Sequence, residues 1–290
     1  MKKIVLLFCC FSMFHISMSG QIKFGLRAGM NMSKLLIPIE KSSTGDKLNS
    51  NEFVTGGVHV GILFKYELME NLSVNSELLY TQKGTRRTFE GDGFYIVNPK
   101  IANPLIIKGD KKSFVTISNS YLEVPLTINY KLGPVELGAG FYSGILLSSK
   151  GSGEINIIGK NPVSDRLLVL LNHNYLRDKT VGASEYSNIK KNKVNVAGSI
   201  IDYPYEQSAY HDFDQKDGNW YSTLDFGFVG SLYYYFNKNF FAGVRMNYGL
   251  KSIAKDQYLL SDAYLDGTKP QKLDGGVKNY NYQFTIGFTF

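Results

Sequence analysis

Nine charged side chains stand among apolar or small residues, and they are the first candidates for chemistry in this 290-residue chain. Opposite charges enclosed in a low-dielectric interior must pair to be tolerated. The set therefore predicts either a structural network of salt bridges or a path for ions or solutes. We expect the structural role, with Arg27, Glu77, Glu123, Arg245 and Asp225 in one cluster. The full set is Arg27, Lys65, Lys83, Lys131 and Arg245 with Glu77, Glu123, Glu136 and Asp225.

Groupings typical of catalysis or metal binding are sparse. Beyond the first 20 residues the histidines are His59, His173 and His211, and no serine, histidine and aspartate form a recognisable nucleophilic grouping. The stretch HDFD, residues 211–214, could offer two carboxylates to a cation, although a solvated loop is the simpler interpretation. No zinc-ligand spacing occurs. We therefore expect no catalytic residue, no cofactor and no metal site.

The elements that must position these charges are eight segments in which apolar and polar residues alternate. Side chains alternate between the two faces of a strand, so each segment has one apolar face and one polar or small-residue face. Long and short connections also alternate, with tight turns at residues 67–71, 132–134 and 237–239. This pattern predicts an all-β, eight-stranded antiparallel up-and-down transmembrane β-barrel with long extracellular loops. The segments are residues 22–31, 57–66, 72–83, 121–131, 135–146, 221–236, 240–250 and 280–290.

The apolar face of these strands is expected to point outward. A soluble lipocalin-like barrel would point it inward, but the polar face here is rich in glycine, which suits a crowded interior. Aromatic residues collect at the strand ends, as they do at the two interfaces of a bilayer. The nine charged side chains then face the bore, which in an eight-stranded barrel is just wide enough to be filled by side chains. The girdle at the short-turn end is predicted to comprise Phe24, Tyr66, Tyr130, Phe236, Phe240 and Phe290.

The start of the chain has the features of a secretory signal peptide, predicted over residues 1–20. Lys2 and Lys3 precede an apolar run at residues 4–14, which is shorter than the ~20 residues of a spanning helix. Both cysteines lie in this segment, so no disulfide is expected in the mature chain. The net charge of +7 is spread along the sequence, and no basic block indicates nucleic acid. Residues 21–290 are predicted to be a single barrel domain.

The predicted long surface loop at residues 151–219 is too long for an idle connection. Parts of it could extend strands above the membrane as hairpins. Its tyrosines and the neighbouring Trp220 either form a binding surface or pack the loop onto the barrel rim. One further irregularity is Pro125, which lies within a predicted strand and leads us to expect a bulge or kink there.

Four stretches resemble the PorT-type outer-membrane β-barrel family of Bacteroidetes. They are FGLRAGMNMS (24–33), SELLYTQKG (76–84), YLEVPLTINYKL (121–132) and ELGAGFYSGILL (136–147). The resemblance implies a barrel in the cell outer membrane. An outward Phe290 also resembles the signal by which the barrel-assembly machinery recognises such proteins.

The resulting hypothesis is an integral outer-membrane protein without enzymatic activity, with a structural, binding or assembly role through its surface loops. Expected partners are outer-membrane lipid, the barrel-assembly machinery during biogenesis, and secretion or surface proteins. Two alternatives stay open: a PorT-like subunit of a protein secretion apparatus, and an outer-membrane barrel enzyme acting on lipid or peptide.

Overall fold

The computed structural model describes residues 22–38, 40, 48, 50–97, 104–180, 188–213 and 215–290. The predicted signal peptide, residues 1–20, lies outside the described residues. Within the described ranges, extended strands dominate, and one short 3-10 helix, η1 (Asp256–Tyr258), precedes strand β13. No helix in this part of the chain is long and apolar enough to cross a membrane.

Eight strands form a closed antiparallel barrel, which confirms the predicted fold class. Paired neighbours follow the order β1, β3, β4, β5, β6, β11, β12 and β15, and β15 pairs with β1 again. Starting at Lys34 of β1 and moving from each residue to its paired partner on the next strand, the path goes once around the ring and returns to β1 at Phe24. The strands are therefore staggered, as closure of a barrel requires. The strands are β1 (Ile22–Leu36), β3 (Thr55–Met69), β4 (Leu72–Val97), β5 (Leu105–Leu132), β6 (Val135–Asn161), β11 (Leu224–Tyr235), β12 (Phe240–Gly249) and β15 (Lys278–Thr289).

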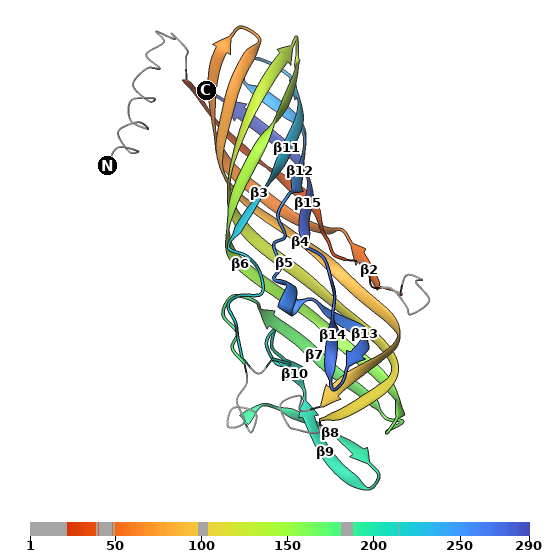
Figure 1. Ribbon diagram of the computed structural model, residues 1–290. Coiled ribbons are helices and arrows are strands. Elements are labelled where there is room, and N and C mark those ends of the chain that lie inside the picture. The colour runs from red at the N-terminus through yellow and green to blue at the C-terminus, as the bar shows by residue number, and fades with distance from the viewer. Residues whose placement is uncertain are drawn as a thin grey trace, which may run out of the picture.

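The barrel has a short-turn end and a long-loop end. Figure 1 shows the short turns and the C-terminus at one end and the extended strands β4, β5 and β6 at the other. The turn between β11 and β12 is stabilised by Asn237, whose side-chain oxygen accepts hydrogen bonds from the backbone N–H groups of Asn239 and Phe240. At the turn between β5 and β6, Gly133 has a φ of 59°, which favours glycine.

Smaller strands enlarge the sheet at the long-loop end. β2 (Ser50–Phe53) pairs with β4, and β7 (Arg166–Asn174) pairs with β6 and with β10 (Glu206–Gln207). Two separate hairpins lie nearby: β8 (Lys191–Val196) with β9 (Ser199–Pro204), and β13 (Leu260–Asp266) with β14 (Lys269–Lys272).

Much of what the sequence analysis predicted as loop is strand. β4 and β5 continue far beyond the predicted segments 72–83 and 121–131, and β6 runs to Asn161. Residues 151–219, predicted as a long surface loop, contain the end of β6 and all of β7, β8, β9 and β10. Strand extensions and hairpins were expected within this range and are present. The continuation of β4 and β5 was not predicted, because the predicted segments follow an apolar outer face that suits lipid, and this face ends where the extensions begin.

Where the barrel passes into the extension formed by β4, β5 and β6, the apolar face of the sheet changes from the outer to the inner side. On the barrel part of β6, Leu137, Phe141 and Ile145 are exposed on the outer face. On its extension the exposed outer residues include Lys150 and Lys160. Correspondingly, the inner face changes from buried polar side chains to buried apolar ones. The outer face therefore suits lipid around the barrel and water around the extension.

A β-bulge lies at the inversion. The register of β5 with β6 shifts between Ser120 and Tyr121, where Leu147 is the extra residue on β6. Odd-numbered residues of β6 point outward up to Leu147 and inward from Ser149 onward. One inserted residue thus exchanges the two faces of the strand.

Of the bulge or kink predicted at Pro125, the bulge is absent. Pro125 pairs with Tyr142 of β6, and the register with β4 is the same on both sides of it. Only the pairing of Glu77 and Leu78 with β5 is interrupted. Proline lacks a backbone N–H, so it removes a ladder bond here without shifting the strand.

Candidate functional site: the barrel interior and the loop-end pocket

The middle of the barrel interior holds one acid between two bases. Arg27 Nη1 lies 2.6 Å from Glu77 Oε1, and Arg245 Nη1 lies 2.9 Å from Glu77 Oε2. Arg27 also donates to the hydroxyl of Thr285 at 2.7 Å. All of these side chains are buried. The two guanidiniums satisfy both oxygens of Glu77, as a buried carboxylate requires, and leave one surplus positive charge.

A second group, toward the long-loop end, holds one base between two acids. Lys83 forms ion pairs with Glu123 and, at 3.3 Å, with Asp225. Asn279 donates to Asp225 Oδ2 at 2.8 Å, and the hydroxyl of Tyr142 donates to the same oxygen at 3.1 Å. The surplus charge of this group is negative, so it offsets the surplus of the group around Glu77.

The remaining charged residues lie toward the short-turn end. Lys65 pairs with Glu136 at 2.6 Å, and Asn129 donates to Glu136 at 2.8 Å. Lys131 lies 4.7 Å from the ring centroid of Tyr235, a cation–π distance. The five residues predicted as one cluster thus lie in two separate groups. Lys83, which was not among those five, is the centre of the second group.

Aromatic side chains fill the bore beside these groups. Tyr233, Tyr235 and Phe241 are buried with Leu63 at the short-turn end. Inward glycines make room for such rings: a Cβ on Gly287 would lie 2.2 Å from Phe241, and one on Gly227 would lie 2.6 Å from Tyr142. The glycines on the inner face could be recognised in the sequence, but the rings that they accommodate could not. The interior is a packed core of ion pairs and aromatic rings.

The residues predicted as the aromatic girdle lie on the outer face near the short turns. Five of them are exposed there, and Tyr66 is half-buried. Phe236 and Phe240 are neighbours with ring centroids 5.4 Å apart, and the backbone N–H of Phe290 donates to Phe24 at 2.7 Å. Phe290 therefore lies where β15 meets the start of β1.

An aromatic cluster covers the long-loop mouth of the barrel. Trp220 stacks on Tyr258 at 5.0 Å, and Tyr175 contacts both Trp220 and Tyr221 edge to face. The hydroxyl of Tyr210 donates to the carbonyl of Tyr175 at 2.6 Å and accepts from the backbone N–H of Trp220 at 2.7 Å. The hydroxyl of Tyr210 thus both donates and accepts a hydrogen bond, so this part of the cluster is a specific packing arrangement.

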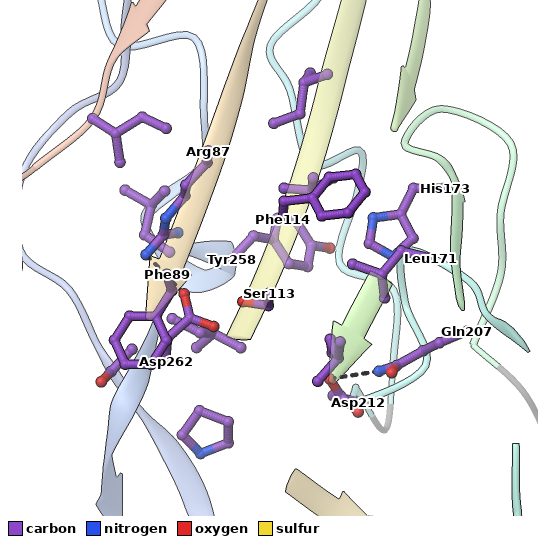
Figure 2. A pocket seen from close by; sticks show the side chains of 18 of the residues that line it. Arg87, Phe89, Ser113, Phe114, Leu171, His173, Gln207, Asp212, Tyr258 and Asp262 are labelled. Atoms are coloured by element: carbon purple, nitrogen blue, oxygen red, sulfur yellow. Dashed lines mark hydrogen bonds and ion pairs between the residues drawn. The ribbon is translucent and has the colours of Figure 1, made fainter. Parts of the chain in front are cut away.

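Next to this cluster lies a cavity of about 210 Å³, which we call the loop-end pocket. Strand β5 contributes Ser113 and Val115, and strand β7 contributes Leu171 and His173. The aromatic cluster contributes Trp220, Tyr221 and Tyr258. Figure 2 shows Arg87 and Asp262 at one end of this pocket and Gln207 and Asp212 at the other. A largely apolar cavity with a few polar groups at its ends is typical of small-ligand sites.

The first end of the pocket carries two bases and an acid. Asp262 lies 2.8 Å from Lys111 and 3.1 Å from Arg87. Burial opposes ionisation of Asp262, but Lys111 and Arg87 outweigh it and lower the pKa of this carboxyl. Lys111 also lies 5.8 Å from the ring centroid of Phe89 and 5.5 Å from that of Phe94. This end can present N–H donors to an acceptor group of a ligand.

The second end carries neutral and acidic groups. Gln207 donates to Asp212 at 2.9 Å, while its buried side-chain oxygen has no hydrogen-bond partner. His173 Nδ1 lies 3.0 Å from the hydroxyl of Tyr175, and burial lowers the pKa of His173 to about 4. His173 is therefore neutral at pH 7. This end can accept hydrogen bonds from a ligand through Gln207 and Asp212.

The other two described histidines do not line the loop-end pocket. His59 lies inside the barrel, 2.7 Å from Asn31 and 2.9 Å from Thr285, and His211 is buried. Of the carboxylates in HDFD, Asp214 lies outside the described residues. Among the residues that the structure describes, no group of three or more potential metal ligands occurs. No signal in the sequence distinguishes Arg87, Lys111 or Asp262, because they are ordinary charged residues far apart in the chain.

The chain belongs to the outer membrane protein beta-barrel domain family, whose model matches residues 17–255. It is therefore an integral protein of the outer membrane. Barrels of this kind have short periplasmic turns and longer extracellular loops, so the long-loop end is the extracellular one. The closing strand β15 lies beyond the matched residues. No curated protein matches the chain.

Several solved outer-membrane barrels are remotely similar in fold. The attachment invasion locus protein Ail of Yersinia pestis is 10% identical, with 93% of this chain and 99% of that chain covered and a TM-score of 0.32. OprG of Pseudomonas aeruginosa is 9% identical over 93% and 97%, with a TM-score of 0.37. The protease OmpT of Escherichia coli is 11% identical over 94% and 97%, with a TM-score of 0.28. Similarity at this level does not indicate a shared role.

Proposed function

We propose that this protein is a non-enzymatic binding protein of the cell surface, in which a filled barrel holds the loop-end pocket above the outer membrane. The observation that carries the proposal is the construction of the pocket. Its walls are formed by extensions of the barrel strands β4, β5 and β6 and by β7, and its roof is the aromatic cluster around Trp220. A pocket built on strands that continue into a rigid barrel is held in a defined shape before any ligand arrives.

The geometry of the pocket supports binding more than hydrolysis. Ser113, His173 and Asp212 all line it, yet no hydrogen bond links them. His173 contacts the hydroxyl of Tyr175, and Asp212 accepts from Gln207. A serine nucleophile needs its base within hydrogen-bond reach, and the base needs an orienting partner.

Trp220 provides a direct test, because it is the single tryptophan of the chain and lines the pocket. Its fluorescence should change in a saturable manner when purified protein in detergent is titrated with fractions of cell-surface or medium extracts. The variant Ser113→Phe, which fills the pocket from its β5 wall, should abolish the response. The control Ser152→Phe adds the same ring on the exposed outer face of β6 and should retain it. An equal response in both variants would place binding elsewhere.

The resemblance of four stretches to the PorT-type family supports a second candidate, a subunit of a protein secretion apparatus. The barrel-assembly machinery is a further proposed partner, during insertion. Crosslinking in intact outer membranes, followed by mass spectrometry, distinguishes the two candidates. One stoichiometric protein partner would favour the secretion subunit, whereas absence of such a partner together with a ligand response of Trp220 would favour the binding protein.

A further inference from the structure

Two lysines lie on the outer face of the barrel where its apolar surface ends on the extracellular side. Lys34 follows the exposed Met30 and Met32 on β1, and Lys278 precedes Tyr280 and the exposed Tyr282 on β15. Each lysine is the next outward residue beyond its apolar run. These positions correspond to the level of lipid headgroups.

The register brings the two lysines together. Lys34 is directly opposite Tyr280, and Lys278 is opposite Leu36, so the lysines are diagonal neighbours on one face of the β1–β15 pair. Diagonal neighbours in an antiparallel pair lie about 7–8 Å apart, within reach of long side chains. One anionic group between them could therefore contact both ammonium groups.

Three tyrosines border the same place. Tyr280 and Tyr248 are directly paired neighbours on β15 and β12, and their ring centroids are 6.4 Å apart. The hydroxyls of Tyr280 and Tyr282 are 2.5 Å apart, and Lys278 Nζ lies 5.9 Å from the ring centroid of Tyr248. We call Lys34, Lys278, Tyr248, Tyr280 and Tyr282 the lysine–tyrosine seam. It presents ammonium and hydroxyl donors directly above apolar side chains.

Within the described part of the chain, no acidic side chain pairs with the lysines of the seam. The sequences of β1, β12 and β15 contain no acidic residue, and neither lysine forms an ion pair with any described residue. Lysines on the extension are placed differently: Lys112 pairs with Glu90, and Lys160 pairs with Asp92 and Asp110. Two adjacent unpaired lysines repel each other unless an anion lies between them.

We propose that the lysine–tyrosine seam binds the phosphate headgroup of an outer-leaflet lipid. Lys34 and Lys278 would contact the phosphate, the tyrosine hydroxyls would donate to its ester or sugar oxygens, and the acyl chains would lie along Met30, Met32 and Phe284. A lipid is the expected source of the phosphate because the donors are continuous with the apolar outer face of the same strands. This site is separate from the loop-end pocket and does not depend on the function proposed for it.

Native mass spectrometry of the purified full barrel in detergent tests the proposal. The probes are dioleoyl phosphatidic acid and dioleoyl phosphatidylcholine, which share acyl chains and differ in headgroup charge, with inorganic phosphate as a third. The wild-type protein should retain phosphatidic acid over phosphatidylcholine. In the double variant Lys34→Gln/Lys278→Gln this preference should fall roughly tenfold or more, at about 1 kcal/mol for each lysine near a charged lipid surface.

The control Lys193→Gln/Lys238→Gln removes the same charge from the exposed β8 strand and from the β11–β12 turn, and it should leave the preference unchanged. Heat-dependent gel mobility checks that each variant is folded. Equal retention of phosphatidic acid by the wild type and the seam variant would overturn the proposal. Binding of inorganic phosphate without the lipid would assign the seam to a soluble anion, and a dimer lost in the seam variant would assign it to a second copy of the chain; either result also overturns it.

Discussion

Arg27 of β1 and Glu77 of β4 form a buried ion pair across the barrel interior, with 2.6 Å between Nη1 and Oε1, although β3 lies between their strands. Arg245 reaches the same carboxylate from β12. The carboxylate of Glu77 therefore links β4 to β1 and β12, and none of these three strands is paired with another of them.

Glu77→Gln should strongly destabilise the barrel, because it leaves two buried guanidiniums without a counter-charge. Removing one partner of a buried ion pair costs about 3–5 kcal/mol. Urea unfolding of the purified protein, followed by heat-dependent gel mobility, measures the change. The control is Glu67→Gln, since Glu67 pairs with Lys23 at 2.8 Å on the surface and should contribute less than about 1 kcal/mol. Equal effects of the two substitutions would show that the interior pair is not structural.

Gly227→Ala should destabilise the barrel, whereas Gly230→Ala should be nearly neutral. A Cβ at Gly227 would lie 2.2 Å from the carbonyl oxygen of Tyr248 and 2.6 Å from the ring of Tyr142, and one at Gly230 would meet nothing within 4 Å. Overpacking typically costs about 1–3 kcal/mol. Urea midpoints of the two variants provide the comparison, and similar midpoints would contradict the tight packing of the bore.

Asp262→Asn should weaken the extracellular extension at neutral pH and have less effect in acid. The folded protein lowers the pKa of Asp262 below its ordinary value of 3.8, so its ion pairs with Lys111 and Arg87 contribute fully above that value. Their contribution decreases as pH falls through the lower pKa of the folded state. Losing these charged hydrogen bonds should cost about 1–3 kcal/mol at pH 7.

Denaturant titrations of wild type and Asp262→Asn, monitored by the fluorescence of Trp220, measure this difference. Comparing the two proteins at each pH cancels the titration of other groups such as His173. The difference should be largest at pH 7 and should shrink below about pH 4. A difference that grows in acid would reverse the predicted sign.

The purified barrel should show no discrete conductance in planar bilayers. Its bore contains the ion-paired groups around Glu77 and Lys83 and the buried rings of Tyr233, Tyr235 and Phe241. An eight-stranded barrel leaves room for little more than such side chains. Reproducible single-channel steps that disappear with the protein would contradict this prediction.

Several features could be predicted from the sequence because they depend on a local period. Alternation of residue type places Arg27, Glu77 and Asp225 on one face and Phe24 and Phe290 on the other, whatever the neighbouring strands are. The glycine-rich polar face and the aromatic strand ends then indicate that the charged face points inward. The alternation of tight turns with long connections then indicates an up-and-down barrel of eight strands. The same reasoning failed beyond Thr85 on β4 and beyond Leu147 on β6, where the strands continue with the opposite face apolar.

The sequence by itself thus determined the number of barrel strands, the separation of their side chains into two faces and the apolar surface that makes this an outer-membrane barrel. Only the tertiary structure decided which charges meet, because the stagger of the closed ring brings Glu77 to both Arg27 and Arg245 and gives Lys83 the acids Glu123 and Asp225. It also decided that the long strands curve around an aromatic cluster and enclose the loop-end pocket. The physical reason is that face alternation is set within one strand, whereas pairing, stagger and cavities arise from contacts between strands distant in the chain.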